Sequence, residues 1–234
     1  MRIKGISLRL LAAVIAFALG IGFATYYRLR NSGPSIKVRQ LKAERAAPTG
    51  CFPGKSFQLN VAAKGTYFPT DAVAKRQNEG YSKHLAAMEE ASLYASDNSA
   101  VESYRFLWLR SFNHPVAVHI WKTEADQFIT LKETSGAGGY EPGHILINQT
   151  RKLERAEWDA FVSRLDDLCY WNLPTTDPEG QGFDGAQWIL EGVRGDRYHI
   201  VDRWTPQSGS YREACLYALK LAGFKVDAPD QSIY

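Results

Sequence analysis

The sequence predicts an α+β domain in which a mainly antiparallel sheet of about six strands is packed by two to three helices. Segments rich in aromatic and β-branched residues follow one another across short turns, a pattern that favours hairpins over parallel strand-helix-strand units. Other segments repeat apolar residues every three or four positions, as helices lying on a sheet do. Because 45% of the residues are hydrophobic, the chain can form a core, and we expect the helices to cover one face of the sheet.

The first element is a hydrophobic segment at residues 1–27. Three basic residues precede an uncharged run from Leu10 to Tyr27, which is long enough as a helix, at about 1.5 Å per residue, to cross a bilayer core. A cleaved signal peptide has a similar pattern, so both readings stay open. An uncleaved signal-anchor is favoured because an aromatic and cationic collar suited to the membrane interface follows the run: Tyr26, Tyr27, Arg28 and Arg30.

Residues 28–56 are expected to form a basic linker that contains Pro and Gly, and residues 57–234 a single globular domain. The basic residues of the linker would favour a cytoplasmic body under the positive-inside rule, but long domains are translocated largely regardless of charge. We therefore expect a body outside the cytoplasm that is anchored by one N-terminal span, or secreted or periplasmic if the segment is cleaved.

The first half of the body predicts one helix and four strands. Helix formers and apolar residues at helical spacing mark residues 79–95. Three strands then follow as an antiparallel meander, at 104–112, 116–122 and 128–132, with turns at Asn113–Pro115 and Glu124–Asp126. A fourth strand at 144–149 comes after a glycine-rich loop.

The second half predicts a helix, a hairpin and a final helix. Apolar residues recur at three- and four-residue steps over 154–170, which is typical of a helix packed on a sheet. Strands at 187–193 and 198–204 flank Gly195-Asp196, a favourable two-residue hairpin turn. Ser210 and Glu213 have the spacing of a capping box and predict the start of the last helix.

The charge distribution argues against a nucleic-acid partner. Ten of the 28 Lys and Arg but only one of the 25 acidic residues precede Phe57, so the body carries 18 basic and 24 acidic side chains. A protein that follows a phosphate backbone would instead concentrate cations on its folded surface. We expect the partners to be the membrane, through the N-terminal helix, and a protein or small-molecule ligand.

Three cysteines, Cys51, Cys169 and Cys215, contain no CxxC pair and therefore no zinc-knuckle or dithiol motif. Cys169 and Cys215 fall on the apolar sides of predicted helices. Buried thiols are favoured there over a disulfide between the two residues.

Two loops carry weak signals for ligands. The loop 135–143 is rich in glycine and could bind an anion through its amides, but it lacks the ending of a phosphate loop, so a hairpin loop is the favoured interpretation. Asp177, Glu179 and Asp184 have part of the spacing of a calcium loop, but Trp188 occupies the position that needs a bidentate Glu. Solvated turn residues explain this segment better than a metal site.

The last hairpin carries the most specific candidate site. With a two-residue turn, Glu191 faces Ile200 and Asp202 faces Ile189, so both acids lie on one face of the sheet as a possible acid–base pair. An exposed pair screened by arginine is the favoured alternative. The candidate ligand-binding residues are aromatic or basic, types that dominate binding surfaces: Trp188, Trp204, Arg203 and Tyr198.

No sequence motif identifies an enzyme. The histidines show no metal-ligand spacing, and no GxSxG motif or nearby Ser–His or Cys–His pair marks a nucleophile. We therefore expect no cofactor and a non-enzymatic module of the cell envelope that binds a protein or ligand through the last hairpin and its preceding loop. The alternative is a hydrolase that uses Glu191 and Asp202, acting on a glycan.

Overall fold

The computed structural model of the protein describes residues 51, 56–60, 63, 65–95, 102–177, 182 and 184–226. All of them belong to one compact unit that extends over residues 47–234. The hydrophobic segment 1–27 and most of the linker lie outside the described residues. Within the described ranges, no helix is both long and apolar enough to cross a membrane.

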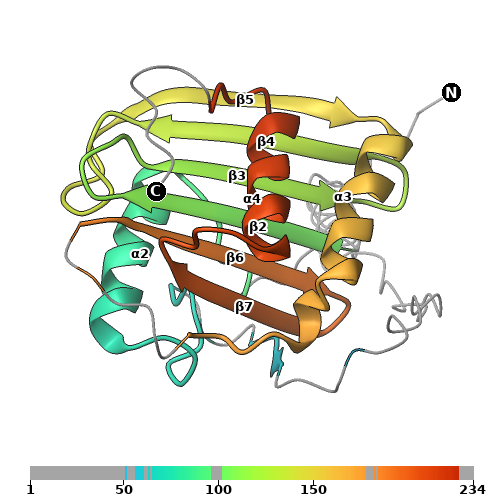
Figure 1. Ribbon diagram of the computed structural model, residues 1–234, viewed down its shortest axis with the longest axis horizontal. Helices are drawn as coiled ribbons and strands as arrows, with labels where there is room; N and C mark the ends of the chain where they lie inside the picture. The colour runs from blue at the N-terminus through green and yellow to red at the C-terminus, as the bar shows by residue number, and fades with distance from the viewer. Residues whose placement is uncertain are drawn as a thin grey trace, which may run out of the picture. The chain divides into compact units, whose positions relative to one another are not determined.

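The body is an α+β domain built on one antiparallel sheet of seven strands (Figure 1). The strands are arranged in the order β1-β7-β6-β2-β3-β4-β5, so the last hairpin, β6 and β7, inserts beside the first long strand. The short β1, which sequence did not predict, pairs with the start of β7. The strands are β1 (Phe57–Gln58), β2 (Glu102–Arg110), β3 (Val116–Lys122), β4 (Gln127–Thr134), β5 (Ile145–Leu153), β6 (Ala186–Arg194) and β7 (Arg197–Trp204).

Helices cover both faces of the sheet, and the expectation of one covered face was wrong. Helices α3 (Arg155–Asp167) and α4 (Ser210–Leu221) lie side by side on one face, with the 3-10 helix η1 (Tyr170–Asn172) following α3. Helix α2 (Lys75–Ala87) lies on the opposite face (Figure 1). Each face has its own apolar core, which explains why the central strand β2 is buried along nearly its whole length.

The α2 face of the sheet is partly polar, so the hydrophobicity pattern of the sequence did not indicate that this face is covered. On β2, Arg105 and Ser103 point to the α2 face together with Leu107 and Leu109, while Tyr104, Phe106 and Trp108 point to the other face. Buried polar residues such as Arg105 break the apolar alternation that would have indicated a second covered face.

The ends of two helices also differ from the predictions. Helix α2 ends at Ala87, well before 95, because Glu89 has a left-handed backbone (φ 54°) and the chain turns back onto the sheet. No capping box forms at Ser210, since Gly209 is the N-cap and Ser210 is already helical. A capping box forms instead at the start of α3, where the Glu157 carboxylate accepts a hydrogen bond from the backbone amide of Glu154 at 2.9 Å.

Candidate functional site

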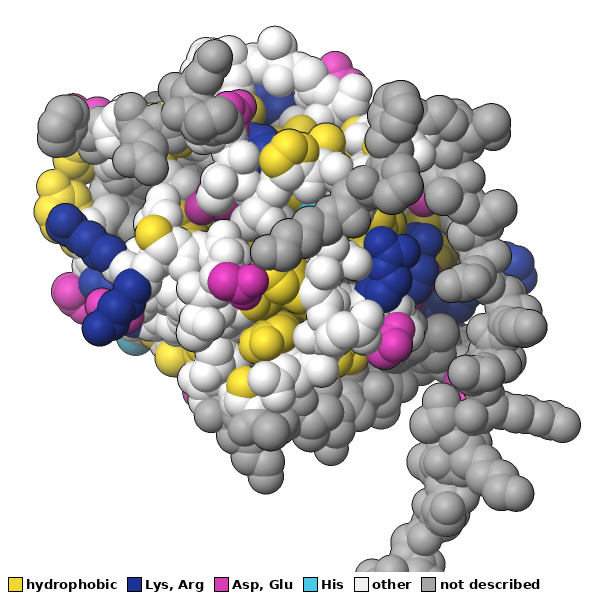
Figure 2. Space-filling view, turned by 90° about the horizontal axis from the view of Figure 1, so that it is seen from below, with side chains coloured by type: hydrophobic (Ala, Val, Ile, Leu, Met, Phe, Trp, Pro, Cys, Tyr) yellow, Lys and Arg dark blue, Asp and Glu magenta, His cyan; other side chains and the backbone are white. Residues whose placement is uncertain are grey.

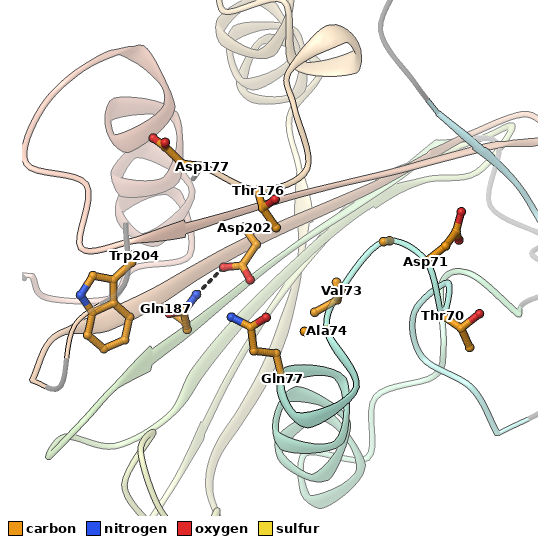
Figure 3. Close-up of a pocket in the computed structure, with 11 residues that line it drawn as sticks. Thr70, Asp71, Val73, Ala74, Gln77, Thr176, Asp177, Gln187, Asp202 and Trp204 are labelled. Atoms are coloured by element: carbon orange, nitrogen blue, oxygen red, sulfur yellow. Dashed lines mark hydrogen bonds between the residues drawn. The ribbon is translucent and has the colours of Figure 1, made fainter. Parts of the chain in front are cut away.

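A cavity of about 380 Å³ opens where the last hairpin meets the segment that leads into α2 (Figure 3). Its walls come from three parts of the chain: residues 70–77 before and within α2, residues 176–177 in the loop before β6, and the strands β6 and β7. The polar and aromatic lining side chains are Thr70, Asp71, Gln77, Thr176, Asp177, Gln187, Asp202 and Trp204. The volume lies in the range of small-molecule sites.

Register explains why β6 and β7 supply three of these residues. Gln187 pairs with Trp204 and Ile189 pairs with Asp202, so Gln187, Asp202 and Trp204 share the α2 face of the sheet. The predicted two-residue turn and the facing pairs that it implied are confirmed. The loop before β6 closes the site from the side, because Thr176 bridges to Asp202 and the Asp202 amide donates to the Thr175 carbonyl at 2.7 Å.

Asp202 forms the floor of the cavity and is only 4% exposed. One carboxylate oxygen accepts the Tyr81 hydroxyl at 2.8 Å, and the other accepts the Gln187 side-chain amide at 2.5 Å. Burial raises the pKa of Asp202 to about 6, since the hydrogen bonds from Tyr81 and Gln187 offset the loss of solvation only in part. The carboxyl group therefore changes its charge near neutral pH.

Trp204 forms the aromatic wall and is held in place by two glycines. A Cβ atom at Gly182 would lie 2.6 Å from the indole Nε1, and one at Gly185 would lie 2.7 Å from Cζ2. Only glycine permits this close approach of the loop to the ring. Gly182 and Gly185 thus pack against an indole that also lines the cavity.

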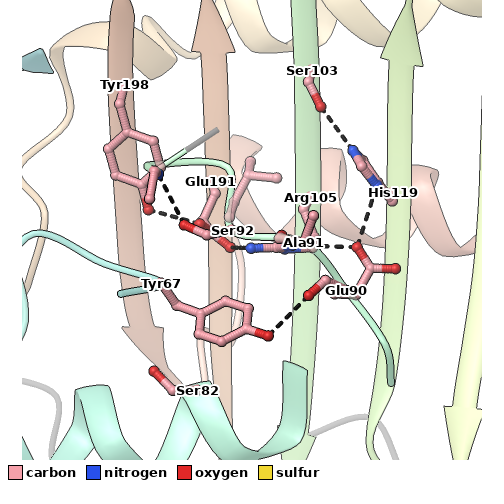
Figure 4. Close-up of polar contacts among 12 residues, drawn as sticks. Tyr67, Ser82, Glu90, Ala91, Ser92, Ser103, Arg105, His119, Glu191 and Tyr198 are labelled. Atoms are coloured by element: carbon pink, nitrogen blue, oxygen red, sulfur yellow. Dashed lines mark hydrogen bonds and ion pairs between the residues drawn. The ribbon is translucent and has the colours of Figure 1, made fainter. Parts of the chain in front are cut away.

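Glu191, the other half of the predicted acid pair, does not line the cavity. It is 0% exposed, and it is held by Arg105, whose Nη2 lies 2.7 Å from Oε1, and by the Tyr198 hydroxyl, 2.7 Å from Oε2 (Figure 4). The favoured alternative of an exposed pair was also wrong, since both acids are buried. Because Glu191 is covered, Glu191 and Asp202 do not face the cavity together as a pair.

Arg105 belongs to a buried ion network that fastens the segment after α2 to the sheet (Figure 4). Its Nη1 lies 3.3 Å from Glu90, which also accepts the Lys132 ammonium at 2.9 Å and faces His119 at 3.3 Å. Burial alone would raise the pKa of Glu90, but its bonds to His119, Arg105 and Lys132 outweigh burial and hold that pKa well below its usual range. Glu90 and Glu191 therefore each face at least one cation of this network.

Within the network, Ser103, His119 and Glu90 form a chain like that of an activated serine. The Ser103 hydroxyl lies 2.8 Å from His119 Nε2, and His119 Nδ1 lies 3.3 Å from Glu90. No sequence motif indicates this arrangement, since the three residues come from different segments. Ser103 is only 1% exposed, so its hydroxyl is covered from solvent, and this hydrogen-bonded series lies on the α2 face of the sheet.

The other predicted ligand-binding residues do not line this cavity. Trp188 lies in the core on the α3 and α4 side, and Tyr198 lies in the core on the α2 side, each 0% exposed. Arg203 donates to the carbonyls of Thr175 and Pro174 at 3.0 and 2.8 Å, which fixes the loop that closes the cavity. Only Trp204 of the four contributes to the cavity wall.

The structure does not assemble a metal site from the described residues, which contain no group of three potential ligands. Asp177 lines the cavity and Asp184 is exposed at a turn, while Glu179 lies outside the described residues.

The glycine-rich loop 135–143 is a hairpin loop, as favoured. The amides of Gly136, Ala137 and Gly138 donate to carbonyls of the protein at 2.9–3.1 Å, so they are not directed at an anion.

The cysteines pair differently from the expectation. Cys51 and Cys169 form a disulfide that joins the start of the domain to the end of α3, and Cys215 is a buried free thiol. Cys169 is not on a helix face, because it lies between α3 and η1 with a left-handed backbone (φ 53°). Because Cys51 lies in the expected linker, the sequence did not indicate that it forms a disulfide with Cys169.

The surface on the β7 side of the sheet carries apolar, acidic and basic side chains in small separate groups (Figure 2). The described residues on this side form no continuous basic surface of the kind that binds a phosphate backbone. Comparisons with known proteins add no identity: no family model, no curated protein and no solved structure matches the chain.

Proposed function

We propose that the protein is a non-enzymatic binding module of the cell envelope, tethered by its N-terminal segment, and that the cavity at the last hairpin takes a small polar ligand. The observation that carries the proposal is the joint presence of a concave site, a fixed indole and a buried carboxyl group in one wall of the domain. Convergent polar groups with a perturbed pKa are typical of binding sites.

A location outside the cytoplasm is supported by the Cys51–Cys169 disulfide. Disulfides persist in oxidising compartments and are rare in the cytoplasm. The uncharged run at residues 10–27 supplies a route to export and membrane attachment. Protease treatment of intact spheroplasts should digest the body, whereas protection until the membrane is permeabilised would contradict this location.

Ligand binding can be tested by thermal stability. A library of polar metabolites should contain compounds that raise the melting temperature of the full-length chain, since a ligand that binds only the folded state stabilises it. Thr176→Trp should abolish the shift, because Thr176 is an exposed residue of the cavity wall and a larger side chain there fills the site. Ser163→Trp, at an exposed position on α3, is the matched control.

The proposal fails if no compound stabilises the chain, or if the stabilising compounds act equally on the Thr176→Trp variant.

A further inference from the structure

We infer that the ligand of the cavity is a saccharide, bound with the apolar face of one sugar ring against Trp204 and its hydroxyl groups towards Asp202, Gln187 and Gln77. This inference rests on the proposed function and specifies the class of ligand. It is carried by three features of the cavity wall: an aromatic side chain, hydrogen-bonding groups beside it, and the charge of the lining.

The first feature is a single aromatic platform. Among the described lining residues, Trp204 is the one aromatic side chain, and Gly182 and Gly185 lie close against its indole. A fixed indole offers a large apolar face with little entropy to lose on binding. The axial C–H groups of a pyranose ring form a flat apolar patch that fits such a face.

The second feature is a set of donors and acceptors beside the platform. Asp202 accepts one hydrogen bond on each oxygen, from Tyr81 and from Gln187, and a carboxylate has about four acceptor positions in all. The remaining positions can accept two neighbouring hydroxyl groups. Gln77, on the first turn of α2, points toward Asp202 from the opposite wall and offers both an amide donor and a carbonyl acceptor (Figure 3).

The third feature is the charge of the lining. Among the described residues, the cavity wall contains Asp71, Asp177 and Asp202 but no Lys, Arg or His. Among these described lining residues, a phosphate or carboxylate ligand would meet three carboxyl groups and no cation. Neutral hydroxyl groups meet no such repulsion, and both protonation states of Asp202 can hydrogen-bond to them.

The cavity volume of about 380 Å³ suits one or two sugar units rather than a long chain lying in a groove. The third feature alone would also permit an amine, because carboxylates attract cations. The apolar wall and the two amide side chains favour the saccharide, and the experiment separates the two ligand classes.

The test is binding of the full-length chain to an array of immobilised glycans that covers hexose, N-acetylhexosamine, uronic acid and heptose units. The chain is solubilised in a detergent without a sugar headgroup, since a glycosidic detergent would compete. Spermidine and inorganic phosphate are titrated separately as non-sugar probes. We expect at least one neutral glycan to bind, and its affinity to fall about tenfold in Trp204→Leu and in Gln77→Leu.

Gln149→Leu is the matched control, because Gln149 is an exposed glutamine on β5 that does not line this cavity. The affinity of this variant for the glycan should equal that of the wild type. Far-ultraviolet circular dichroism confirms that each variant is folded. The two cavity variants alter different elements, so a folding defect in one leaves the other as the test.

The possible failures are distinct. If spermidine or phosphate binds in a manner that Thr176→Trp abolishes and no glycan binds, the cavity is a ligand site but the saccharide assignment is overturned. If glycans bind with equal affinity to the wild type, Trp204→Leu and Gln77→Leu, the saccharide lies elsewhere and the inference is overturned. If none of these probes binds, the saccharide inference is also overturned, and the metabolite screen decides the proposed function independently.

Discussion

Replacing Asp202 with asparagine should stabilise the protein at neutral pH and have little effect in acid. The pKa of Asp202 is raised from 3.8 to about 6, chiefly by burial. In the unfolded chain the group loses its proton near pH 3.8, so between pH 4 and 6 the folded state holds a proton that the unfolded state has lost. The stability that Asp202 contributes is thus present below pH 4 and is lost as the pH rises through 6.

The magnitude follows from the size of the pKa shift. A shift of about two units corresponds, at about 1.4 kcal/mol per unit, to about 3 kcal/mol of stability that is missing above pH 6. Asparagine has nearly the same shape and carries no charge. It can still accept the Tyr81 hydroxyl, and the Gln187 amide can turn to accept its NH₂ group. We therefore expect a gain of up to about 3 kcal/mol at pH 7.5.

The assay is urea denaturation of the wild type and Asp202→Asn at pH 4 and pH 7.5, with the difference in unfolding free energy compared at the two pH values. Comparing the two proteins at each pH cancels the titration of all other groups. Asp184→Asn, at an exposed acid in the same region, is the control and should change stability by less than about 0.5 kcal/mol at either pH. An equal loss of stability at both pH values in Asp202→Asn would refute the reasoning, because it would mean that a hydrogen bond and not a buried charge dominates.

Three further predictions concern the rest of the domain. Cys51→Ser should lower the unfolding free energy by at most about 4–5 kcal/mol, because the disulfide closes a loop with a sequence separation of 118. A reductant should destabilise the wild type but not this variant. Arg105→Met should cost about 3–5 kcal/mol in urea denaturation by leaving Glu90 and Glu191 with a missing partner; a cost below about 1 kcal/mol would contradict the network. Burial, aided by the nearby charge of Lys83, lowers the pKa of His84 to about 4. The unfolding free energy should therefore fall as the pH drops from about 6.5 to 4, and this fall should be smaller in His84→Gln. An equal fall in the variant and the wild type would contradict this role of His84.

Local patterns predicted the regular elements because each depends on neighbours in sequence. The alternation in the strands and the Gly195-Asp196 turn determined the register of the last hairpin, and the helical spacing around Trp158 and Phe161 located α3. The capping box at Ser210 failed because Gly209 takes the N-cap position one residue earlier, a difference that the spacing of the side chains does not reveal.

The second covered face could not be predicted, because it depends on contacts distant in sequence. From sequence alone, Arg105 would be expected to face solvent. It is buried because it pairs with Glu90 and Glu191, which lie 15 and 86 positions away in sequence. The same holds for the Cys51–Cys169 disulfide, since a cysteine in a Pro- and Gly-containing connector carries no signal of its partner.

The candidate site was predicted in part. The hairpin register placed Asp202 and Trp204 on one face, and the same register could have added Gln187, which pairs with Trp204. No sequence signal linked Gln77 or Thr70 to the site, because the segment before α2 reaches it only through the packing of α2 on the sheet. Burial of Glu191 was missed for the same reason as that of Arg105.

The most direct test that the cavity is the binding site is a ¹H–¹⁵N NMR titration that follows the six tryptophan indole signals of the full-length chain. Each signal is assigned with a single Trp→Phe variant, and the titrant is a compound that stabilises the wild type but not Thr176→Trp. The Trp204 signal should shift strongly in proportion to saturation, while that of Trp108, in the core on the far face of the sheet, stays in place. A saturable titration that leaves the Trp204 signal unmoved would show that the ligand binds elsewhere and would contradict the assignment of the cavity.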